Sequence, residues 1–128
     1  GKHFDEGAST IITEKGERVR SKSEKIIADK LYAMAIPYRY EYPITLAGGI
    51  RVYPDFTMLK MPERREVYLE HFGLLDEGSY LESTMRKLNS YSENGIFLGD
   101  NLLITYETSR HPLSTKMLDG ILRSMCMA

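Results

Sequence analysis

The sequence is poor in the features that mark secreted, membrane-bound and strongly charged proteins. Its single cysteine, Cys126, cannot form a disulfide within the chain, which favours a reducing cytoplasm. No apolar run reaches the roughly 20 residues that a membrane helix needs, and no signal peptide is visible. The 17 basic and 18 acidic residues leave a net charge of −1, so overall charge favours no class of partner. These absences predict a cytoplasmic protein without membrane segments.

The size and composition that remain are those of one ordinary globular domain. With 128 residues, of which 42% are hydrophobic, the chain has material for a single core. Residues 1–20 are polar and contain three glycines, so we expect an N-terminal arm there and one domain over residues 21–128. The chain begins with Gly rather than Met, which is typical of a trimmed chain or of a domain cut from a longer protein.

Hydrophobic periodicity predicts an α/β fold with the element order α-β-β-β-α-β-α. Ile27, Leu31 and Met34 recur at helical spacing, and Pro37 ends that helix. Gly48-Gly49 offers a tight turn between two strands. The expected elements are a helix over 22–35, strands over 38–46, 50–58 and 66–72, a helix over 77–93, a strand over 102–106 and a helix over 114–125.

The side chains of the expected strands and second helix sort onto faces. Tyr38, Tyr40 and Tyr42 fall on one face of the first strand, opposite Arg39 and Glu41. On the second helix two stripes are possible. The apolar one contains Leu81, Met85, Leu88 and Ser92, and the other contains Tyr80, Lys87, Tyr91 and Asn94.

Two acidic residues stand out because they fall in expected strands, where such residues are depleted. Asp55 follows Pro54 in the second strand, and Glu70 lies fifteen positions later in the third. A half-buried carboxylate is costly unless it is paired or binds a cation. Strand alternation lets Asp55 and Glu70 face one another, and paired carboxylates suit a hard divalent ion such as Mg²⁺. The alternative is that both acids are surface residues on a solvated strand face.

A third carboxylate, Glu24, has two interpretations. The run from Ser21 to Glu24 fits a capping box, in which Ser21 is the N-cap and Glu24 reaches back to the N–H of Ser21. However, Glu24 lies three and seven residues before Ile27 and Leu31, and therefore on the buried face of the helix. A carboxylate that points inward towards the sheet favours a functional site.

Together these residues resemble the motif of the PD-(D/E)XK nuclease superfamily, the restriction-endonuclease-like fold, in a bacterial branch. Pro54-Asp55 matches the first half of the motif, Glu70 the acidic residue of the second half, and Glu24 the glutamate often found on the first core helix. The resemblance covers roughly residues 21–106. It implies an α-β-β-β-α-β core, with a mixed central sheet flanked by helices. It also implies a metal-dependent DNA nuclease whose Mg²⁺ or Mn²⁺ is held by Asp55, Glu70, Glu24 and the backbone carbonyl of His71.

The sequence departs from this motif at the lysine, because Phe72 stands two residues after Glu70. In some members of the superfamily the lysine has moved to the following helix, and Lys87 is the candidate here. The alternative for Lys87 is an ordinary surface lysine. Without a lysine at the site, the chain would be a catalytically inactive domain that binds nucleic acid or serves assembly within a larger DNA-processing protein. A third hypothesis is a plain α/β interaction domain whose three carboxylates do not converge.

The expected partner is DNA, and the resemblance adds a fused or associated helicase-type module. Affinity for DNA comes largely from neutralising its phosphates, so a chain with a net charge of −1 is poorly equipped to bind DNA tightly by itself. Tight binding would therefore need a homodimer or a fused domain.

Overall fold

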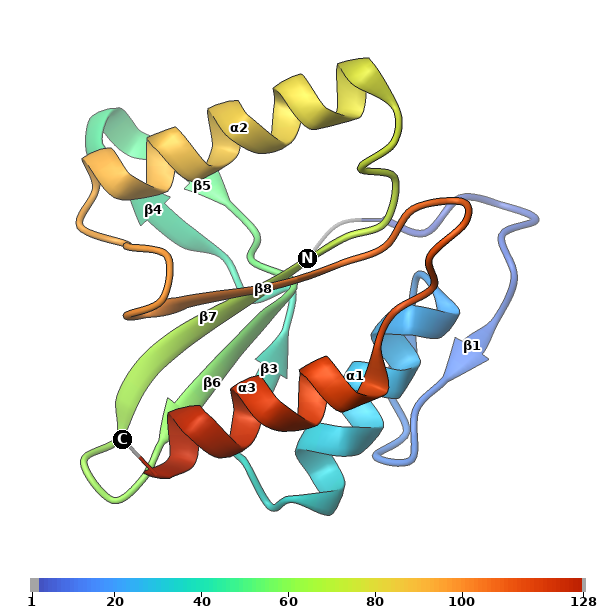
Figure 1. The fold of residues 1–128 in the computed structure, drawn as a ribbon, viewed down its shortest axis with the longest axis horizontal. Coiled ribbons are helices and arrows are strands. Elements are labelled where there is room, and N and C mark those ends of the chain that lie inside the picture. Colours follow the sequence, from blue (N-terminus) through green and yellow to red (C-terminus); the bar gives the residue numbers. More distant parts are fainter. Residues whose placement is uncertain (1–2, 128) are drawn as a thin grey trace.

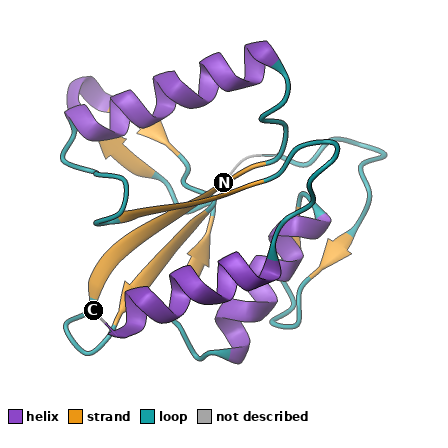
Figure 2. Ribbon diagram, in the orientation of Figure 1, coloured by secondary structure: helices purple, strands orange, loops and turns teal. Residues whose placement is uncertain are grey.

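A mixed four-stranded sheet with helices on both faces forms the centre of the protein. The structure is a computed structural model that describes residues 3–127. The order in the sheet is β3-β6-β7-β8, in which β3, β6 and β7 are antiparallel and β8 is parallel to β7. Helices α1 and α3 lie on one face, and α2 lies on the other together with the hairpin β4–β5 (Figures 1 and 2). The chain therefore has an α/β fold with a mixed sheet flanked by helices.

The bounds of the elements follow the expected order with two interruptions. The helices are α1 (Lys22–Ala33), α2 (Gly78–Glu93) and α3 (Thr115–Met127), with a 3-10 turn at Ala47–Gly49. The strands are β1 (Ile11–Ile12), β2 (Arg18–Val19), β3 (Tyr38–Tyr40), β4 (Ile44–Leu46), β5 (Ile50–Val52), β6 (Phe56–Lys60), β7 (Arg65–Phe72) and β8 (Leu102–Tyr106). The expected arm over residues 1–20 contains the β1–β2 hairpin, which packs on α1.

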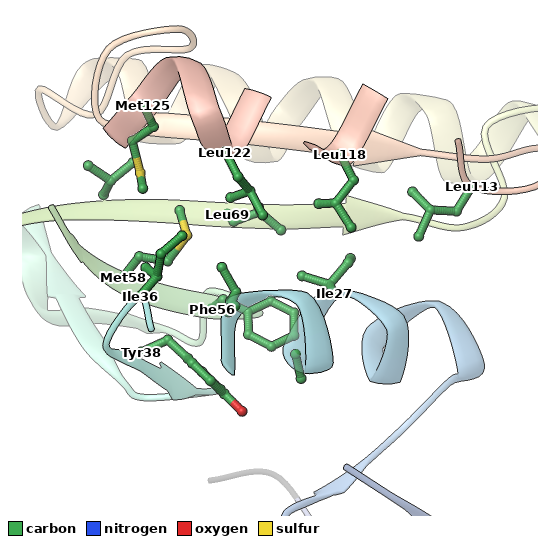
Figure 3. Close-up of a cluster of buried hydrophobic side chains, with 13 residues drawn as sticks. Ile27, Ile36, Tyr38, Phe56, Met58, Leu69, Leu113, Leu118, Leu122 and Met125 are labelled. Carbon is green, nitrogen blue, oxygen red and sulfur yellow. The ribbon is translucent and has the colours of Figure 1, made fainter. Parts of the chain in front are cut away.

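The main core lies between the sheet and the pair α1 and α3. Phe56, Met58, Val67 and Leu69 alternate along β6 and β7 and are fully buried on this face. Ile27 and Leu31 of α1, with Leu118, Leu122 and Met125 of α3, pack against them (Figure 3). A second core lies under α2 and contains Leu46, Tyr91, Ile96 and Leu102. Both faces of the sheet are covered, as is typical of sheets that contain parallel strands.

Two of the expected strands are wrong as continuous elements. The strand predicted over 38–46 divides into β3 and β4, and the strand predicted over 50–58 divides into β5 and β6. Pro43 and Pro54 explain the breaks, because proline cannot donate to a sheet and restricts the residue before it. The separated halves β4 and β5 form their own hairpin around Gly48, whose φ of +79° favours glycine.

The first break also turns one tyrosine away from the face on which it was expected. The rings of Tyr38 and Tyr40 both pack on Phe56, as the alternation predicts. Glu41 then adopts a φ of +49°, so the alternation ends there. Tyr42 lies instead beside Arg39, whose guanidinium carbon is 4.6 Å from the centre of the Tyr42 ring.

Helix α2 packs on the sheet with the more polar of its two stripes. Its buried residues are Thr84 and Tyr91, whereas Leu81 and Met85 of the apolar stripe are 43% and 53% exposed. The first two members of the apolar stripe therefore do not pack on the sheet. None of the helices within residues 3–127 combines the length and the apolar character that crossing a membrane requires.

Candidate functional site

Asp55 and Glu70 lie side by side where β6 begins and β7 approaches its end. In the antiparallel register Phe56 pairs with Leu69, so the next residues outward are Asp55 and Glu70. The Asp55 N–H donates to Oε1 of Glu70 at 3.2 Å, and the His71 N–H donates to Oδ2 of Asp55 at 2.7 Å. Glu70 thus accepts from the backbone of Asp55, and Asp55 accepts from the backbone of the residue that follows Glu70. Asp55 itself lies one residue before β6 rather than within a strand.

Glu70 is almost fully buried, and α2 supplies both of its side-chain partners. The Lys87 ammonium lies 2.8 Å from Oε2 of Glu70, whose side chain is only 1% exposed. The Tyr91 hydroxyl donates to the same oxygen at 2.5 Å. Burial and the negative charge of Glu70 raise the pKa of Tyr91 well above its usual value, so Tyr91 remains a hydrogen-bond donor. Lys87 therefore reaches the sheet beside Glu70, and it is not a free surface lysine.

The environment of Asp55 opposes its ionisation. Burial raises its pKa most, and the charge of Glu70 adds to the rise, bringing the pKa of Asp55 to about 8. The His71 N–H and the Lys87 ammonium act in the opposite direction, while the charge of Glu24 raises the pKa further. The carboxylates of Asp55, Glu70 and Glu24 and the ammonium of Lys87 thus share one electrostatic neighbourhood.

Glu24 lies on α1, where the structure confirms its capping role; its role in a functional site stays a prediction. Ser21 is the N-cap of α1, and its hydroxyl accepts the Glu24 N–H at 3.1 Å. The return bond goes from the Arg20 N–H to Oε1 of Glu24 at 2.9 Å, so the expected partner, the Ser21 N–H, is wrong by one residue. Oε1 also accepts from the Tyr40 hydroxyl at 2.7 Å, and Glu24 is only 8% exposed. Glu24 is therefore a capping residue whose buried carboxylate also lies close to the other acids.

The carboxylate oxygens of this site provide some, but not all, of the ligands that a hard divalent ion needs. Within residues 3–127, no three His, Cys, Asp or Glu side chains are grouped closely enough to enclose a metal ion by themselves. Mg²⁺, however, commonly uses one or two carboxylates and keeps several waters. Asp55 and Glu70 supply two carboxylates, and after burial the charge of Glu70 is the largest influence that raises the pKa of Asp55. The oxygen donors of this pair are thus compatible with Mg²⁺ or Mn²⁺.

His71 points to the opposite face of β7, as the alternation predicts, and joins a separate hydrogen-bonded network. Its Nδ1 lies 2.7 Å from Oγ1 of Thr105, and its Nε2 lies 2.7 Å from Oε1 of Glu107. The hydroxyl of Ser23 donates to the same oxygen of Glu107. Burial acts to raise the pKa of Glu107, but the hydrogen bonds from Ser23 and His71 outweigh it and lower the pKa. This network joins α1, β7 and the end of β8 directly behind Glu24 and Glu70.

Phe72, where the resemblance would expect a lysine, is 5% exposed and carries no charge. The positive group beside Glu70 therefore comes from α2 rather than from β7. The start of α2 is tied to the end of β7 because the Gly73 N–H donates to the Tyr80 hydroxyl at 2.9 Å. That bond links the first turn of α2, the helix that carries Lys87, to the end of the strand that carries Glu70.

Sequence reasoning missed the pair Arg20 and Glu41, which borders the site. Two hydrogen bonds, at 2.7 and 3.1 Å, join the Arg20 guanidinium to the Glu41 carboxylate. The Glu41 N–H donates to the carbonyl of Asp55 at 3.0 Å, so this ion pair supports the backbone of Asp55. No local pattern links two residues 21 positions apart. The role of Tyr91 was easier to predict, because Tyr91 lies four residues after Lys87 and therefore on the same helical stripe.

Comparison with known proteins adds little to this geometry. No protein-family profile matches the sequence. A stretch of 86 residues, 66% of the chain, is 33% identical to Uncharacterized protein MJ1519 of Methanocaldococcus jannaschii. That stretch covers 7% of the relative's length, so the chain is similar to a small part of a much longer protein.

Proposed function

We propose that this chain is a metal-dependent DNA nuclease domain of the PD-(D/E)XK type, with its lysine displaced to the second core helix. The observation that carries the proposal is the 2.8 Å contact between Lys87 Nζ and Oε2 of Glu70. It brings the missing basic group of the motif to the acidic residue of the motif from a different element. An α/β fold with a mixed sheet flanked by helices is the architecture that the motif requires.

The residues of the site have separable roles under this proposal. Asp55, Glu70 and the backbone carbonyl of His71 would hold Mg²⁺ or Mn²⁺, with Glu24 at the border of the site. A bound ion of this kind activates a water and offsets the negative charge of a phosphoryl transition state. Tyr91 holds Glu70 in place through Oε2. Lys87, 36% exposed at its side chain, offers N–H donors both to Glu70 and towards solvent, where a phosphate would lie.

The reaction would be hydrolysis of a phosphodiester. The oxygen of a water forms a bond to phosphorus, and the bond from phosphorus to the leaving sugar oxygen breaks. One proton of the water is released from the attacking oxygen, and the leaving oxygen takes up one proton. The ammonium of Lys87 would stabilise the charge that develops on the phosphoryl oxygens.

The setting of the domain is part of the same proposal. Similarity to 7% of a much longer protein supports a domain fused to other modules, of which a helicase-type module is our candidate. A homodimer is the other arrangement that would add contacts to DNA. The single cysteine, Cys126, is exposed and unpaired, which supports a reducing, cytoplasmic environment.

The proposal is tested by comparing the wild-type chain with Lys87→Ala in cleavage of plasmid and single-stranded DNA, with Mg²⁺ and with Mn²⁺. We expect the wild type to cut and Lys87→Ala to cut about 10²–10³ times more slowly, because a preorganised charge at the transition state is lost. Lys87→Arg should restore only part of the rate, since its planar fork cannot replace a compact ammonium.

The neighbouring Arg86 provides the matched control. Arg86→Ala removes one positive charge from the same helix, but Arg86 is 72% exposed and pairs only with Glu82 among the contacts of the described residues. It should leave the rate unchanged. Equal rates for wild type and Lys87→Ala would show that the displaced lysine has no catalytic role. Binding of DNA without cleavage by the wild type, with either metal ion, would favour the inactive binding module.

A further inference from the structure

The face of the sheet that carries Asp55 and Glu70 continues beyond them as ordered cross-strand rows. Arg39 pairs with Thr57 and Thr57 pairs with Tyr68, which makes a row across β3, β6 and β7. This row lies two residues along each strand from the carboxylates, or about 7 Å away. In the following row Leu59 pairs with Glu66. Side chains two apart on a strand share a face, so both rows adjoin the candidate site on its own side of the sheet.

A half-open cavity of about 440 Å³ lies over these two rows. Its lining contains a cation, an aromatic ring, a hydroxyl and a carboxylate, contributed by Arg39, Tyr42, Thr57 and Glu66. Binding pockets of roughly 300–1,000 Å³ are typical for small organic ligands. The guanidinium of Arg39 stacks over the ring of Tyr42, and Tyr42 is 45% exposed. Two planar groups therefore border the cavity.

Thr57, which is part of the lining of this cavity, carries a polar group that the protein leaves unsatisfied. Thr57 is 6% exposed, and its Oγ1 has no hydrogen-bond partner within the described residues. A buried hydroxyl without a partner is uncommon in native structures, because its desolvation is not compensated. A hydroxyl can both donate and accept, so it suits the edge of a heteroaromatic ring.

We propose that this cavity is a subsite for one base of a single-stranded DNA substrate, next to the nucleotide whose phosphate lies at Asp55 and Glu70. The inference rests on the proposed nuclease function and assigns its substrate class. Tyr42 and Arg39 stack on the base, Thr57 contacts its edge from below, and the carboxylate of Glu66 accepts from an exocyclic amino group.

The chemistry of the lining favours a base over a phosphate or a duplex. A carboxylate at the rim would repel a phosphate, whereas it accepts hydrogen bonds from base amino groups. Aromatic and guanidinium planes are the usual platforms on which unpaired bases stack. A base inside a duplex is stacked between its neighbours and cannot enter a side pocket without being extruded. The preferred substrate is therefore single-stranded.

The test is binding of a single-stranded oligonucleotide carrying 2-aminopurine, in the presence of EDTA so that no cleavage occurs. Fluorescence quenching reports stacking of the probe, and anisotropy reports affinity. Tyr42→Ala should abolish the quenching and weaken binding about 10-fold, which is the scale of one lost stacking contact. Thr57→Val should weaken binding about 3-fold or more without lowering the melting temperature, because it replaces an unpaired buried hydroxyl with a methyl group.

Tyr32→Ala is the matched control, because Tyr32 is an exposed tyrosine on α1, on the opposite face of the sheet. It should leave quenching and affinity unchanged, as should a blunt duplex of the same sequence tested on all variants. Unchanged quenching and affinity in both Tyr42→Ala and Thr57→Val would overturn the subsite, even if the wild type cleaves DNA. If the wild type binds the oligonucleotide but cleaves no DNA, and both variants lose binding, the result would support the subsite and contradict the nuclease function.

Discussion

At the scale of single residues, the site is organised around one nearly inaccessible carboxylate. Glu70 is 1% exposed and has three partners, namely the N–H of Asp55 just before β6, and the Lys87 ammonium and Tyr91 hydroxyl of α2. A buried carboxylate is tolerated only when its charge is paired and its oxygens are hydrogen-bonded. Asp55 has less compensation, and burial together with the charge of Glu70 raises its pKa to about 8. The cost of holding these acids together therefore falls mainly on Asp55.

Ionisation of the buried Asp55 beside Glu70 should make the stability of the metal-free protein depend on pH, and Asp55→Asn should remove that dependence. Because the pKa of Asp55 is raised in the folded state, its protonated form stabilises the fold at low pH, and this contribution is lost as the pH rises from about 4 towards 8. Asn cannot ionise, and its amide oxygen can still accept the His71 N–H. The variant should thus gain stability over wild type as pH rises, by ~1.4 kcal/mol or more at pH 8.

Urea denaturation with EDTA at several pH values measures this difference. Glu82→Gln is the control, because the Glu82 side chain lies on α2 and is 72% exposed. The stability of this variant relative to wild type should not vary with pH. A constant difference between Asp55→Asn and wild type would show that Asp55 ionises normally.

At the scale of elements, three segments meet through one partly buried network beside the carboxylates. Ser23 of α1 and His71 of β7 both bond to Oε1 of Glu107, which follows β8. The Glu107 N–H also donates to the carbonyl of Phe72 at 2.9 Å. Ser23 precedes Glu24 and His71 follows Glu70, so the network sets where α1 stands relative to β7. We regard Glu107 as a positioning residue for both acids.

Glu107→Ala should loosen this junction. It leaves the His71 ring and the Ser23 hydroxyl without their acceptor, which should cost about 1–3 kcal/mol of unfolding free energy. Apparent affinity for Mn²⁺ should fall about 10–100-fold, as it does when the outer partners of metal ligands are removed. Glu107→Gln keeps an oxygen at the same position and should restore most of both losses. Calorimetric titration and urea denaturation test the two effects, and wild-type Mn²⁺ affinity in Glu107→Ala would contradict the positioning role.

At the scale of the whole molecule, charge limits what the domain can do by itself. The net charge is −1, and the cations nearest the site are already paired, Arg20 with Glu41 and Lys87 with Glu70. Few phosphates can be neutralised by such a surface. Under the proposed function, specific contacts around the carboxylates and the adjoining cavity, rather than a broad basic track, would supply most of the recognition of DNA.

Single-stranded DNA should therefore bind to the isolated chain weakly and with little dependence on salt. Each neutralised phosphate contributes a slope of about −0.7 to the plot of log K against log salt for single strands, so two or three contacts predict a slope of about −1.5 to −2. Fluorescence anisotropy over a series of KCl concentrations gives the slope, and sedimentation in the same buffers gives the oligomeric state. A slope steeper than about −4 from a monomer would disprove this view of the surface.

Local patterns in the sequence were enough to predict the three helices, the strands β7 and β8, and the facing of Asp55 and Glu70. The periodicity of two along strands places Asp55 and Glu70 on one face, and the register of β6 and β7 confirms this. The helical period places Lys87 and Tyr91 on one stripe, which is the stripe that meets Glu70. The N-cap at Ser21 and the extents of α2, β7 and β8 follow from signals that lie within a few residues of each element. These features depend on the order of residues along the chain.

Only the tertiary structure decided the features that depend on distant partners. Arg20 pairs with Glu41, where the chain breaks its first strand and turns Tyr42 towards Arg39. Helix α2 exposes Leu81 and Met85 because its polar stripe faces the sheet, where Lys87 pairs with the carboxylate of Glu70. The network through Glu107 joins residues 36 and 84 positions apart. Such contacts form only when separate elements pack, and the free energy of packing outweighs local preference, which is why no short pattern could predict them.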